Sequence, residues 1–313
     1  MATYKKRGYK PGNKKEENQS DESAYETAGV LNTLDETASK SEQWIEKNSK
    51  PLLITLISLV VVFLGYLGYN KFIDEPKELE AADELAFPRK YFDDAAVAGS
   101  GVDSLLNLGL EGADGKYGFV DIAESYSGTN AGNLANYYAG VSYLQLKQYD
   151  KALPFLLAYN GKKGKWNNTD FYQLGYTYYQ QKEYENAISQ FNKIINGNDS
   201  VAQNAYYHLA ESYLKTDKKQ QALNAFKTAS EMNFDIKIQE DASLNYAKLS
   251  YEIGNPYQSV PEVLNAYVTK YPNTPYKQEI NTLLISSYIT SKNYKEALIL
   301  LERNKSPENK LAY

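Results

Sequence analysis

Hydrophobic residues recur with a helical spacing along much of this chain, and residues 171–195 show the pattern clearly. This stretch reads FYQLGYTYYQQKEYENAISQFNKII. At about 100° of rotation per residue, its opening places four residues on the face that meets a partner helix: Phe171, Leu174, Gly175 and Tyr178. A second face carries three further tyrosines: Tyr172, Tyr176 and Tyr179. The first face predicts helix packing, and the surroundings of the second face bear on function.

The same pattern occurs five times at intervals of 35 to 38 residues. Each copy begins with a small or apolar residue, and residues of related type follow three, nine, twelve and sixteen positions later. The copies begin at Gly140, Gly175, Ala210, Ala247 and Ile285, of which the fourth copy is degenerate. Two helices approach closely only where side chains are small, so Gly175 is expected to face Ala187 on the next helix. Because each hairpin leaves an apolar face for its neighbour to cover, the pattern predicts an all-α solenoid over residues 134–304.

The motif L-G-x-x-Y followed by Y-x-x-A-x-x-x-F resembles the tetratricopeptide repeat (TPR), and the resemblance covers residues 134–303. In that family the first helix of each hairpin lines a concave groove in which a ligand lies. The resemblance implies groove positions three residues before the small residue and one and four residues after it. In this sequence these positions and one neighbour are Tyr137, Val141, Leu144, Tyr172, Tyr176, Tyr179, Tyr207, Glu211, Leu214, Lys215, Leu244, Lys248, Tyr251, Thr282, Ser286 and Ile289.

Two readings of the groove tyrosines remain open at this point. Some of the rings could pack against the neighbouring copy instead of contacting a ligand. If they line the groove, we expect water behind Tyr172, Tyr176 and Tyr179, so that losing them changes binding more than stability, whereas Tyr178 is structural. Lys215 and Lys248 alone do not form the cluster of Lys, Arg and Asn that clamps a C-terminal carboxylate.

Residues 51–70, PLLITLISLVVVFLGYLGYN, carry no charge. At 1.5 Å per residue they reach about 30 Å, which is the thickness of a bilayer's hydrocarbon core. The stretch therefore predicts one transmembrane helix, with a buried helix of a soluble protein as the alternative. Nine Lys or Arg residues precede it, which favours a cytoplasmic N-terminus and a repeat array on the other side.

The remaining segments are less regular. Residues 1–50 are polar and predict a largely disordered cytoplasmic tail, in which residues 30–45 could form a short amphipathic helix. Residues 71–133 predict a degenerate leading hairpin, with a kink at Pro88 and a glycine-rich loop after residue 111. Residues 305–313 predict the start of a further helix or a truncated end. We therefore expect a longer array, or contacts of Leu284, Leu298 and Leu301 with a partner.

The segments IEKNSKPLLITLISLVVVFLGYLGYNKF and AGNLANYYAGVSYLQLKQYDKAL together resemble single-pass repeat proteins of Bacteroidota envelopes. Those proteins are similar to the ancillary subunit of the Sec translocon. Residues 166–313 instead resemble a stretch of the long TPR proteins of the same bacteria. The resemblance implies a single-pass protein of the bacterial inner membrane, with a cytoplasmic N-terminus and a periplasmic TPR domain.

Composition argues against several classes of function. The net charge is -5 and no basic block is present, so nucleic-acid binding is not expected. Cysteine is absent and His208 is the one histidine, which leaves no thiolate site and no pair of imidazoles. No serine lies in a G-x-S-x-G context. The sequence therefore predicts no enzyme, no cofactor, no metal site and no small-molecule substrate, and His208 is expected to be a packing residue.

Two functions from different classes follow. In the first, the groove binds polypeptide at the cell envelope, with a chaperone-like role beside the Sec translocon as its most specific form. In the second, the protein is a passive scaffold for envelope, secretion or cell-wall complexes. The partner, the choice between many clients and one constant partner, and the oligomeric state do not follow from the sequence.

Overall fold

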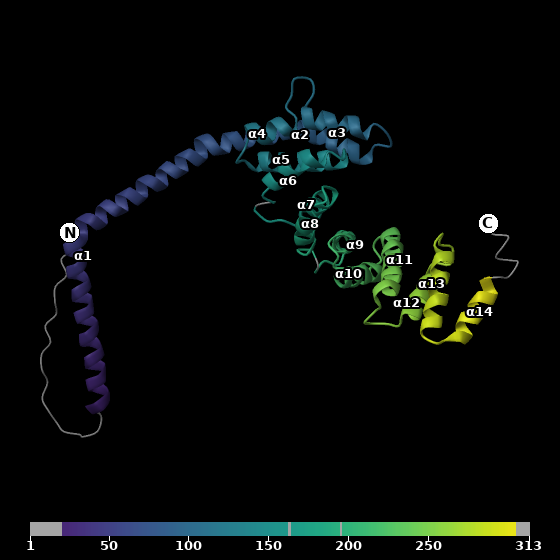
Figure 1. Ribbon diagram of the computed structural model, residues 1–313. Helices are drawn as coiled ribbons and strands as arrows, with labels where there is room; N and C mark the ends of the chain where they lie inside the picture. The colour runs from purple at the N-terminus through teal and green to yellow at the C-terminus, as the bar shows by residue number, and fades with distance from the viewer. Residues whose placement is uncertain (1–20, 162–163, 195, 305–313) are drawn as a thin grey trace, which may run out of the picture. The chain divides into compact units, whose positions relative to one another are not determined.

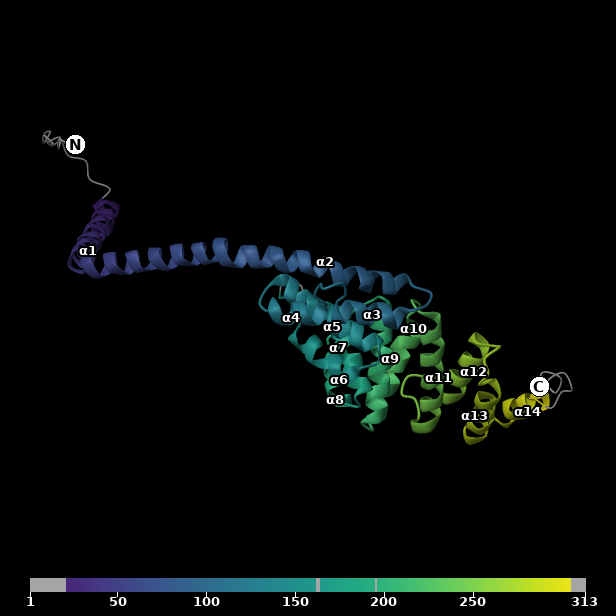
Figure 2. The same ribbon diagram turned by 90° about the horizontal axis from the view of Figure 1, so that it is seen from above.

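The computed structural model describes residues 21–161, 164–194 and 196–304, and every regular element in these ranges is helical (Figures 1 and 2). The chain divides into two compact units, Met1–Ile73 and Asp74–Tyr313. Each unit is described by itself below.

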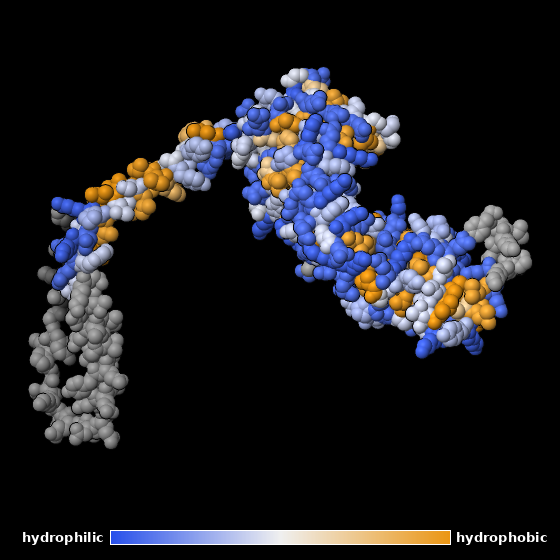
Figure 3. Space-filling model, in the orientation of Figure 1, coloured by the Kyte–Doolittle hydropathy of each residue, from blue (hydrophilic) through white to orange (hydrophobic). Residues whose placement is uncertain are grey.

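The first unit contains the uncharged stretch. Helix α1 spans Asp21–Tyr69, and the π-helix η1 follows at Asn70–Asp74. The side chains between residues 51 and 70 are almost all exposed, which Figure 3 shows as a run of apolar residues. The helix over Glu42–Val97 is long and apolar enough to cross a membrane, and none of its apolar window is buried. Such exposure is not that of a core helix of a soluble protein.

The predicted N-terminal tail is only partly described. The backbone is helical from Asp21 onward, which includes residues 30–45, where a short helix was expected. Residues 1–20 lie outside the described residues, and the expectation of disorder there stays a prediction.

The second unit begins with four helices that pack together. They are α2 (Glu75–Val97), α3 (Val102–Glu111), α4 (Phe119–Ser125) and α5 (Asn130–Gln145). Ala81, Leu85, Phe119 and Ile122 form much of their shared core. The sequence analysis missed α3, whose apolar residues lie between two glycines with positive φ, Gly101 and Gly112.

The side chain of Glu78 on α2 covers the start of α5. Its carboxylate accepts hydrogen bonds from the backbone N–H of Asn130 at 2.7 Å and of Ala131 at 3.2 Å. A carboxylate at this position satisfies free N–H groups and complements the helix dipole. The leading helices are thereby joined to the first hairpin of the array.

Five consecutive helix hairpins form the array, and we number them copies one to five. The hairpins are α5 with α6 (Tyr149–Ala158), α7 (Asn168–Gln180) with α8 (Tyr184–Phe191), α9 (Ser200–Lys215) with α10 (Lys219–Glu231), α11 (Ile236–Ile253) with α12 (Val260–Lys270), and α13 (Lys277–Thr290) with α14 (Tyr294–Asn304). Each hairpin packs against the next, so the core continues from copy to copy. The predicted solenoid of helix hairpins is confirmed.

Small residues allow the two helices of a hairpin to cross closely. A Cβ atom added at Gly175 would lie 2.8 Å from Cε1 of Phe191, and one added at Gly140 would lie 2.7 Å from Cδ2 of Leu156. Both distances are too short for real side chains, so the glycines are required by the packing. The nearest neighbour of Gly175 is the Phe191 ring, not Ala187 as expected, although Ala187 is fully buried on the same helix.

The turn inside each hairpin has a left-handed residue seven positions after the small residue. These residues are Lys147 (φ 58°), Lys182 (φ 65°), Asp217 (φ 57°), Gly254 (φ 80°) and Lys292 (φ 63°). In four copies the next backbone N–H donates to the carbonyl of the tyrosine on the first helix, as from Glu183 to Tyr178 at 2.9 Å. This is the hydrogen bond that ends a helix with a left-handed residue. Non-glycine residues bear the conformational cost in four of the five turns.

The side chain of Gln203 closes the connection between copies three and four. It is fully buried, and its Nε2 donates to the carbonyls of Ala229, Met232 and Asp235 at 3.0 to 3.2 Å. Its Oε1 accepts from the backbone N–H of Phe234 at 3.1 Å and of Asp235 at 2.7 Å. One side chain therefore satisfies five backbone groups of the turn that would otherwise lack partners.

The fifth copy exposes apolar side chains on its second helix. Leu298 is 57% and Leu301 37% exposed, and Ile299 lies beside them. Leu284, which was expected to contact a partner together with these leucines, is buried instead. The predicted further helix at 305–313 lies outside the described residues.

Candidate functional site

The first helices of the copies form one continuous face. Helices α7 and α9 contact each other, as do α9 and α11, whereas consecutive second helices do not contact to the same extent (Figures 1 and 2). A stack of hairpins whose first helices lie closer together than their second helices presents the first helices on its inner side. We call this surface the inner face.

The structure places the predicted groove residues at different depths. Those that keep partial exposure are Tyr137, Tyr172, Tyr176, Tyr179, Tyr207, Glu211, Lys248 and Ser286, and those that are exposed are Leu214, Lys215, Tyr251, Thr282 and Ile289. Val141, Leu144 and Leu244 are buried. These three side chains therefore pack between helices and offer no surface to a ligand.

The tyrosines of copy two form a stack along α7. The Tyr172 and Tyr176 rings lie 6.0 Å apart with an interplanar angle of 14°, and the Tyr176 and Tyr179 rings lie 6.4 Å apart at 22°. Residues three or four apart on a helix share one side, which gives this spacing. Such offset stacks are a favourable arrangement for aromatic rings. The stack is therefore a fixed surface and not three independent side chains.

Helix α9 places His208 against the stack. The His208 ring lies 5.0 Å from that of Tyr176, 5.5 Å from Tyr179 and 6.0 Å from Tyr172. It also lies 6.2 Å from the ring of Phe191 in a stacked arrangement. His208 thus joins copies two and three as a packing residue, as the sequence predicts.

Other rings of the protein lie behind Tyr172, contrary to the expectation for a groove residue. Its ring packs on the Phe191 ring at 6.0 Å as well as on His208. Burial raises the pKa of the Tyr172 hydroxyl well above its ordinary value, with smaller contributions from Tyr176 and Glu211. Burial also raises the pKa of Tyr178. The expected contrast between a structural Tyr178 and a water-backed Tyr172 is therefore wrong.

Glu211 is the polar centre of this region. Its Oε2 lies 2.9 Å from Nδ1 of His208, three residues earlier on α9. Burial raises the pKa values of Tyr179 and Tyr207, and the charge of the Glu211 carboxylate and its hydrogen bonds with both hydroxyls raise them further. The Asp241 carboxylate on α11 also raises the pKa of Tyr207. Two carboxylates therefore lie near the Tyr207 hydroxyl.

On the inner face of copies four and five, polar side chains of neighbouring copies pair with each other. Lys248 Nζ lies 2.8 Å from Glu279 Oε1 and 4.9 Å from the centre of the Tyr276 ring. The Tyr251 hydroxyl lies 2.8 Å from Ser286 Oγ. Lys248 and Tyr251, both predicted to bind a ligand, thus have partners on the next copy.

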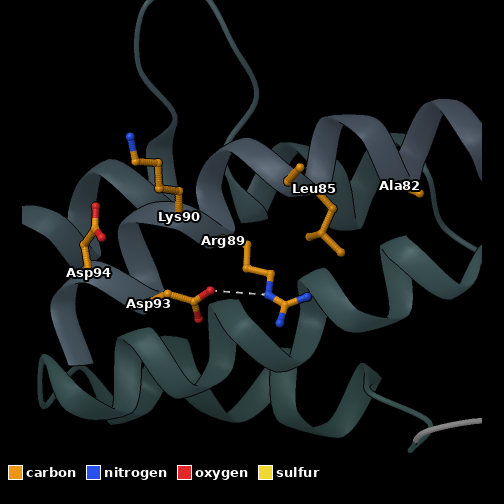
Figure 4. A pocket seen from close by; sticks show the side chains of 7 residues that line it. Ala82, Leu85, Arg89, Lys90, Asp93 and Asp94 are labelled. Carbon is orange, nitrogen blue, oxygen red and sulfur yellow. Dashed lines mark ion pairs between the residues drawn. The ribbon is translucent and has the colours of Figure 1, made fainter. Parts of the chain in front are cut away.

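Other candidate sites were sought in the same residues. Within the ranges that the structure describes, no three His, Asp or Glu side chains come together in a way that could hold a metal ion. A hollow on α2 is lined by Leu85, Arg89, Lys90, Asp93 and neighbouring residues, with Arg89 and Asp93 paired at 3.5 Å (Figure 4). All of its lining residues come from one helix, so it is a depression in the surface and not a built site.

Sequence reasoning missed one residue of the inner face, Asp241, and the ring contacts of another, His208. His208 was assigned to packing, but its place within the tyrosine stack was not foreseen, although its i,i+3 spacing to Glu211 could have indicated the pair. Asp241 lies six residues before Ala247, outside the three positions taken from the family pattern. A full helical turn of positions along α11 would have included it.

Comparisons with known proteins agree with the helix-hairpin architecture. A family model described as "Anaphase-promoting complex, cyclosome, subunit 3" matches residues 157–229, from the end of α6 into α10. A comparison with curated proteins finds no match.

Several solved structures are similar over part of the chain. MamA is 20% identical, with 55% of this chain and 96% of that chain covered and a TM-score of 0.43. YrrB, described as a TPR protein with an unusual peptide-binding site, is 16% identical, with 59% and 89% covered and a TM-score of 0.45. A tetratricopeptide repeat protein from Parabacteroides merdae ATCC 43184 is 16% identical, with 72% and 79% covered and a TM-score of 0.45.

These likenesses are too distant to carry any ligand or partner to this chain. The fold itself rests on the repeated hairpins and on the close crossings at Gly140 and Gly175. The family-model match over residues 157–229 falls within the same array. The chain therefore contains an all-α solenoid of tetratricopeptide-type helix hairpins.

Proposed function

We propose that this chain is a membrane-anchored, non-enzymatic interaction module whose inner face binds polypeptide. The observation that carries the proposal is the ordered aromatic surface made by the stacked rings of Tyr172, Tyr176 and Tyr179 together with the Tyr207 ring, all of which keep partial exposure. Aromatic side chains that are already fixed lose little conformational entropy on binding and contribute large contact areas. They are also the residues most enriched among binding hot spots.

The exposed apolar helix supports the anchoring part of the proposal. Residues 51–70 are uncharged and unburied, which suits contact with lipid. The basic residues before this stretch favour a cytoplasmic N-terminus and a periplasmic array in the bacterial inner membrane. A chaperone-like role beside the Sec translocon is the most specific form of this proposal.

The topology has its own test. Protease added outside spheroplasts is expected to digest the chain after about residue 75 and to spare the N-terminal segment. Digestion of the N-terminal segment, with protection of the array, would contradict the proposed orientation.

The alternative function is a passive scaffold with one constant partner. The exposed strip of Leu298, Ile299 and Leu301 on α14 is the observation that favours it, because an apolar strip of this kind suits a lasting interface (Figure 3).

Photocrosslinking in cells separates the two functions. A photoreactive phenylalanine at position 176 is expected to give many polypeptide products, since Tyr176 lies in the middle of the stack. The same residue at position 298 serves as the comparison on α14. One constant product from both positions favours the scaffold. No polypeptide product from position 176 would contradict binding at the inner face.

A further inference from the structure

We propose that the inner face of copies two and three takes a basic side chain, a lysine or arginine of an extended polypeptide. It would lie on the partly exposed edges of the Tyr176, Tyr179 and Tyr207 rings, outside His208 and beside the carboxylates of Glu211 and Asp241. This inference rests on the proposed function, because it names the chemistry of the polypeptide that the inner face binds.

Within the described ranges, neither carboxylate pairs with a lysine or an arginine. Elsewhere in the array, by contrast, acidic side chains are paired with lysines: Glu185 with Lys218 at 2.7 Å, Glu252 with Lys219 at 2.6 Å, Glu279 with Lys248 at 2.8 Å, and Glu231 with Lys227. Glu211 instead pairs with His208, and the partly exposed Asp241 carboxylate on α11 is close enough to raise the pKa of the Tyr207 hydroxyl. Two partly buried carboxylates without a lysine or arginine leave a local negative charge on the inner face.

The Glu211 carboxylate is held in position and still has free hydrogen-bond acceptor sites. The His208 imidazole holds its carboxylate at 2.9 Å, and 27% of its side chain stays exposed. An ionised carboxylate can accept about four hydrogen bonds. It therefore retains room for an ammonium or guanidinium group that approaches from the inner face. A preorganised acceptor of this kind binds a cation without first having to be ordered.

The rings beside these carboxylates are also free of the chain's own cations. Lysine or arginine groups lie over other rings of the protein: those of Phe87, Tyr138, Tyr143, Phe171, Tyr257, Tyr271 and Tyr276. In the described residues no such group lies over Tyr172, Tyr176, Tyr179 or Tyr207. The faces of aromatic rings attract cations, so a ring surface next to unpaired carboxylates is suited to a basic side chain.

Charge selects among the possible occupants. An acidic or phosphorylated segment would meet Glu211 and Asp241 directly, and like charges brought together at an interface oppose binding. A purely apolar segment would bury both carboxylates without a partner, which is also unfavourable. A basic segment satisfies the carboxylates and the ring faces at once, and it is the occupant to which the proposal commits.

The test uses three fluorescein-labelled synthetic peptides and the full chain in nanodiscs of phosphatidylcholine. The peptides share the frame GSGSLXLXLGSGS, in which X is lysine, glutamine or glutamate. Fluorescence anisotropy gives Kd for each peptide. We expect the lysine peptide to bind at least about tenfold more tightly than the glutamate peptide, and this preference should fall as salt rises from about 50 mM to about 500 mM.

Two substitutions and one control test whether the preference for the lysine peptide comes from the Glu211 and Asp241 carboxylates. Asp241→Asn and Glu211→Gln are each expected to weaken binding of the lysine peptide about threefold to tenfold and to leave the glutamine peptide nearly unchanged. Glu252→Gln, which removes an exposed carboxylate paired with Lys219, is the matched control and should change neither. Within the described residues, no side chain forms a hydrogen bond or ion pair with the Asp241 carboxylate, so Asp241→Asn keeps the test valid if Glu211→Gln unfolds the array.

The outcomes separate this inference from the proposed function. If all three peptides bind equally and Tyr176→Ala weakens them all, the inner face binds polypeptide but the basic preference is wrong. If no peptide binds up to about 1 mM and position 176 gives no crosslinks, the proposed function fails as well. Tighter binding of the glutamate peptide, or equal losses in Asp241→Asn and Glu252→Gln, would also overturn the inference.

Discussion

The inner face of copies two and three differs from that of copies four and five, although both are built from the same hairpin. In copies two and three, stacked tyrosines lie beside two carboxylates that pair with no lysine or arginine of the described residues. In copies four and five, Lys248 pairs with Glu279 and Tyr251 with Ser286, so the polar groups satisfy each other. We therefore propose that a repeat presents a binding surface where its aromatic and acidic groups are ordered without a lysine or arginine partner, and a closed surface where neighbouring copies pair these groups.

Replacing Phe191, which lies beneath the tyrosine stack, is expected to lower the free energy of unfolding more than any other substitution proposed below. Phe191 is fully buried and touches both Tyr172 and His208. Phe191→Ala should lower the free energy of unfolding by about 3–5 kcal/mol, through lost burial and the cavity left behind. It should also weaken peptide binding, because the Tyr172 ring loses the side chain on which it packs. Urea denaturation and anisotropy measure the two effects.

The matching position in copy four provides the control. Val263 is buried sixteen residues after Ala247, as Phe191 is after Gly175. Val263→Ala removes fewer atoms, so it should cost less stability and leave peptide binding unchanged. Equal loss of binding in both variants would show that the two regions do not differ as described.

The second prediction concerns the turn between copies three and four, which the Gln203 side chain stabilises. Gln203→Ala removes five hydrogen bonds and leaves partly buried backbone N–H groups of Phe234 and Asp235 without their side-chain acceptor. We expect a loss of about 2–4 kcal/mol in unfolding free energy. Amide hydrogen exchange should accelerate in residues 232–240 more than in α7. Asn204→Ala, at the neighbouring partly exposed position, is the control, and uniform acceleration along the array would contradict a local role for Gln203.

Alkaline pH offers a third and smaller effect. Burial raises the pKa of Tyr137 to about 12, while the hydroxyl of an unfolded chain ionises near 10.0. The folded state therefore holds this proton when the unfolded state releases it, so stability is full below pH 10.0 and falls as pH rises toward 12. The free energy of unfolding of the wild-type chain should fall between pH 9 and about pH 11. In Tyr137→Phe this fall should be smaller by about 1 kcal/mol. An unchanged pH dependence in this variant would show that Tyr137 is not the cause.

The smallest effect concerns a hairpin turn. Lys182 has a φ of 65°, which glycine adopts without strain. Lys182→Gly should raise the unfolding free energy by about 0.5 kcal/mol, because relief of the left-handed strain slightly exceeds glycine's entropy cost. Gly254 already occupies the same turn position in copy four. Gly254→Lys should therefore destabilise, and a stabilising result there would refute the explanation.

The sequence predicts the array well because its signals are local and repeated. Gly140 and Gly175 lie at close crossings as their spacing indicates. The helix α3 was missed because it belongs to no repeat, and its boundaries are set by Gly101 and Gly112. The depth of each groove residue could not be foreseen either. Val141 and Tyr176 occupy the same repeat position, one residue after the small residue, and only the packing of neighbouring copies decides that Val141 is buried and Tyr176 partly exposed.

Paired photocrosslinking tests the central contrast most directly. A photoreactive phenylalanine placed at position 176 or at position 251 samples the two regions of one inner face with the same probe. The account predicts abundant crosslinks to polypeptide from position 176, which the lysine peptide competes away, and few crosslinks from position 251. Equal crosslinking from both positions, or crosslinks from position 251 alone, would contradict it.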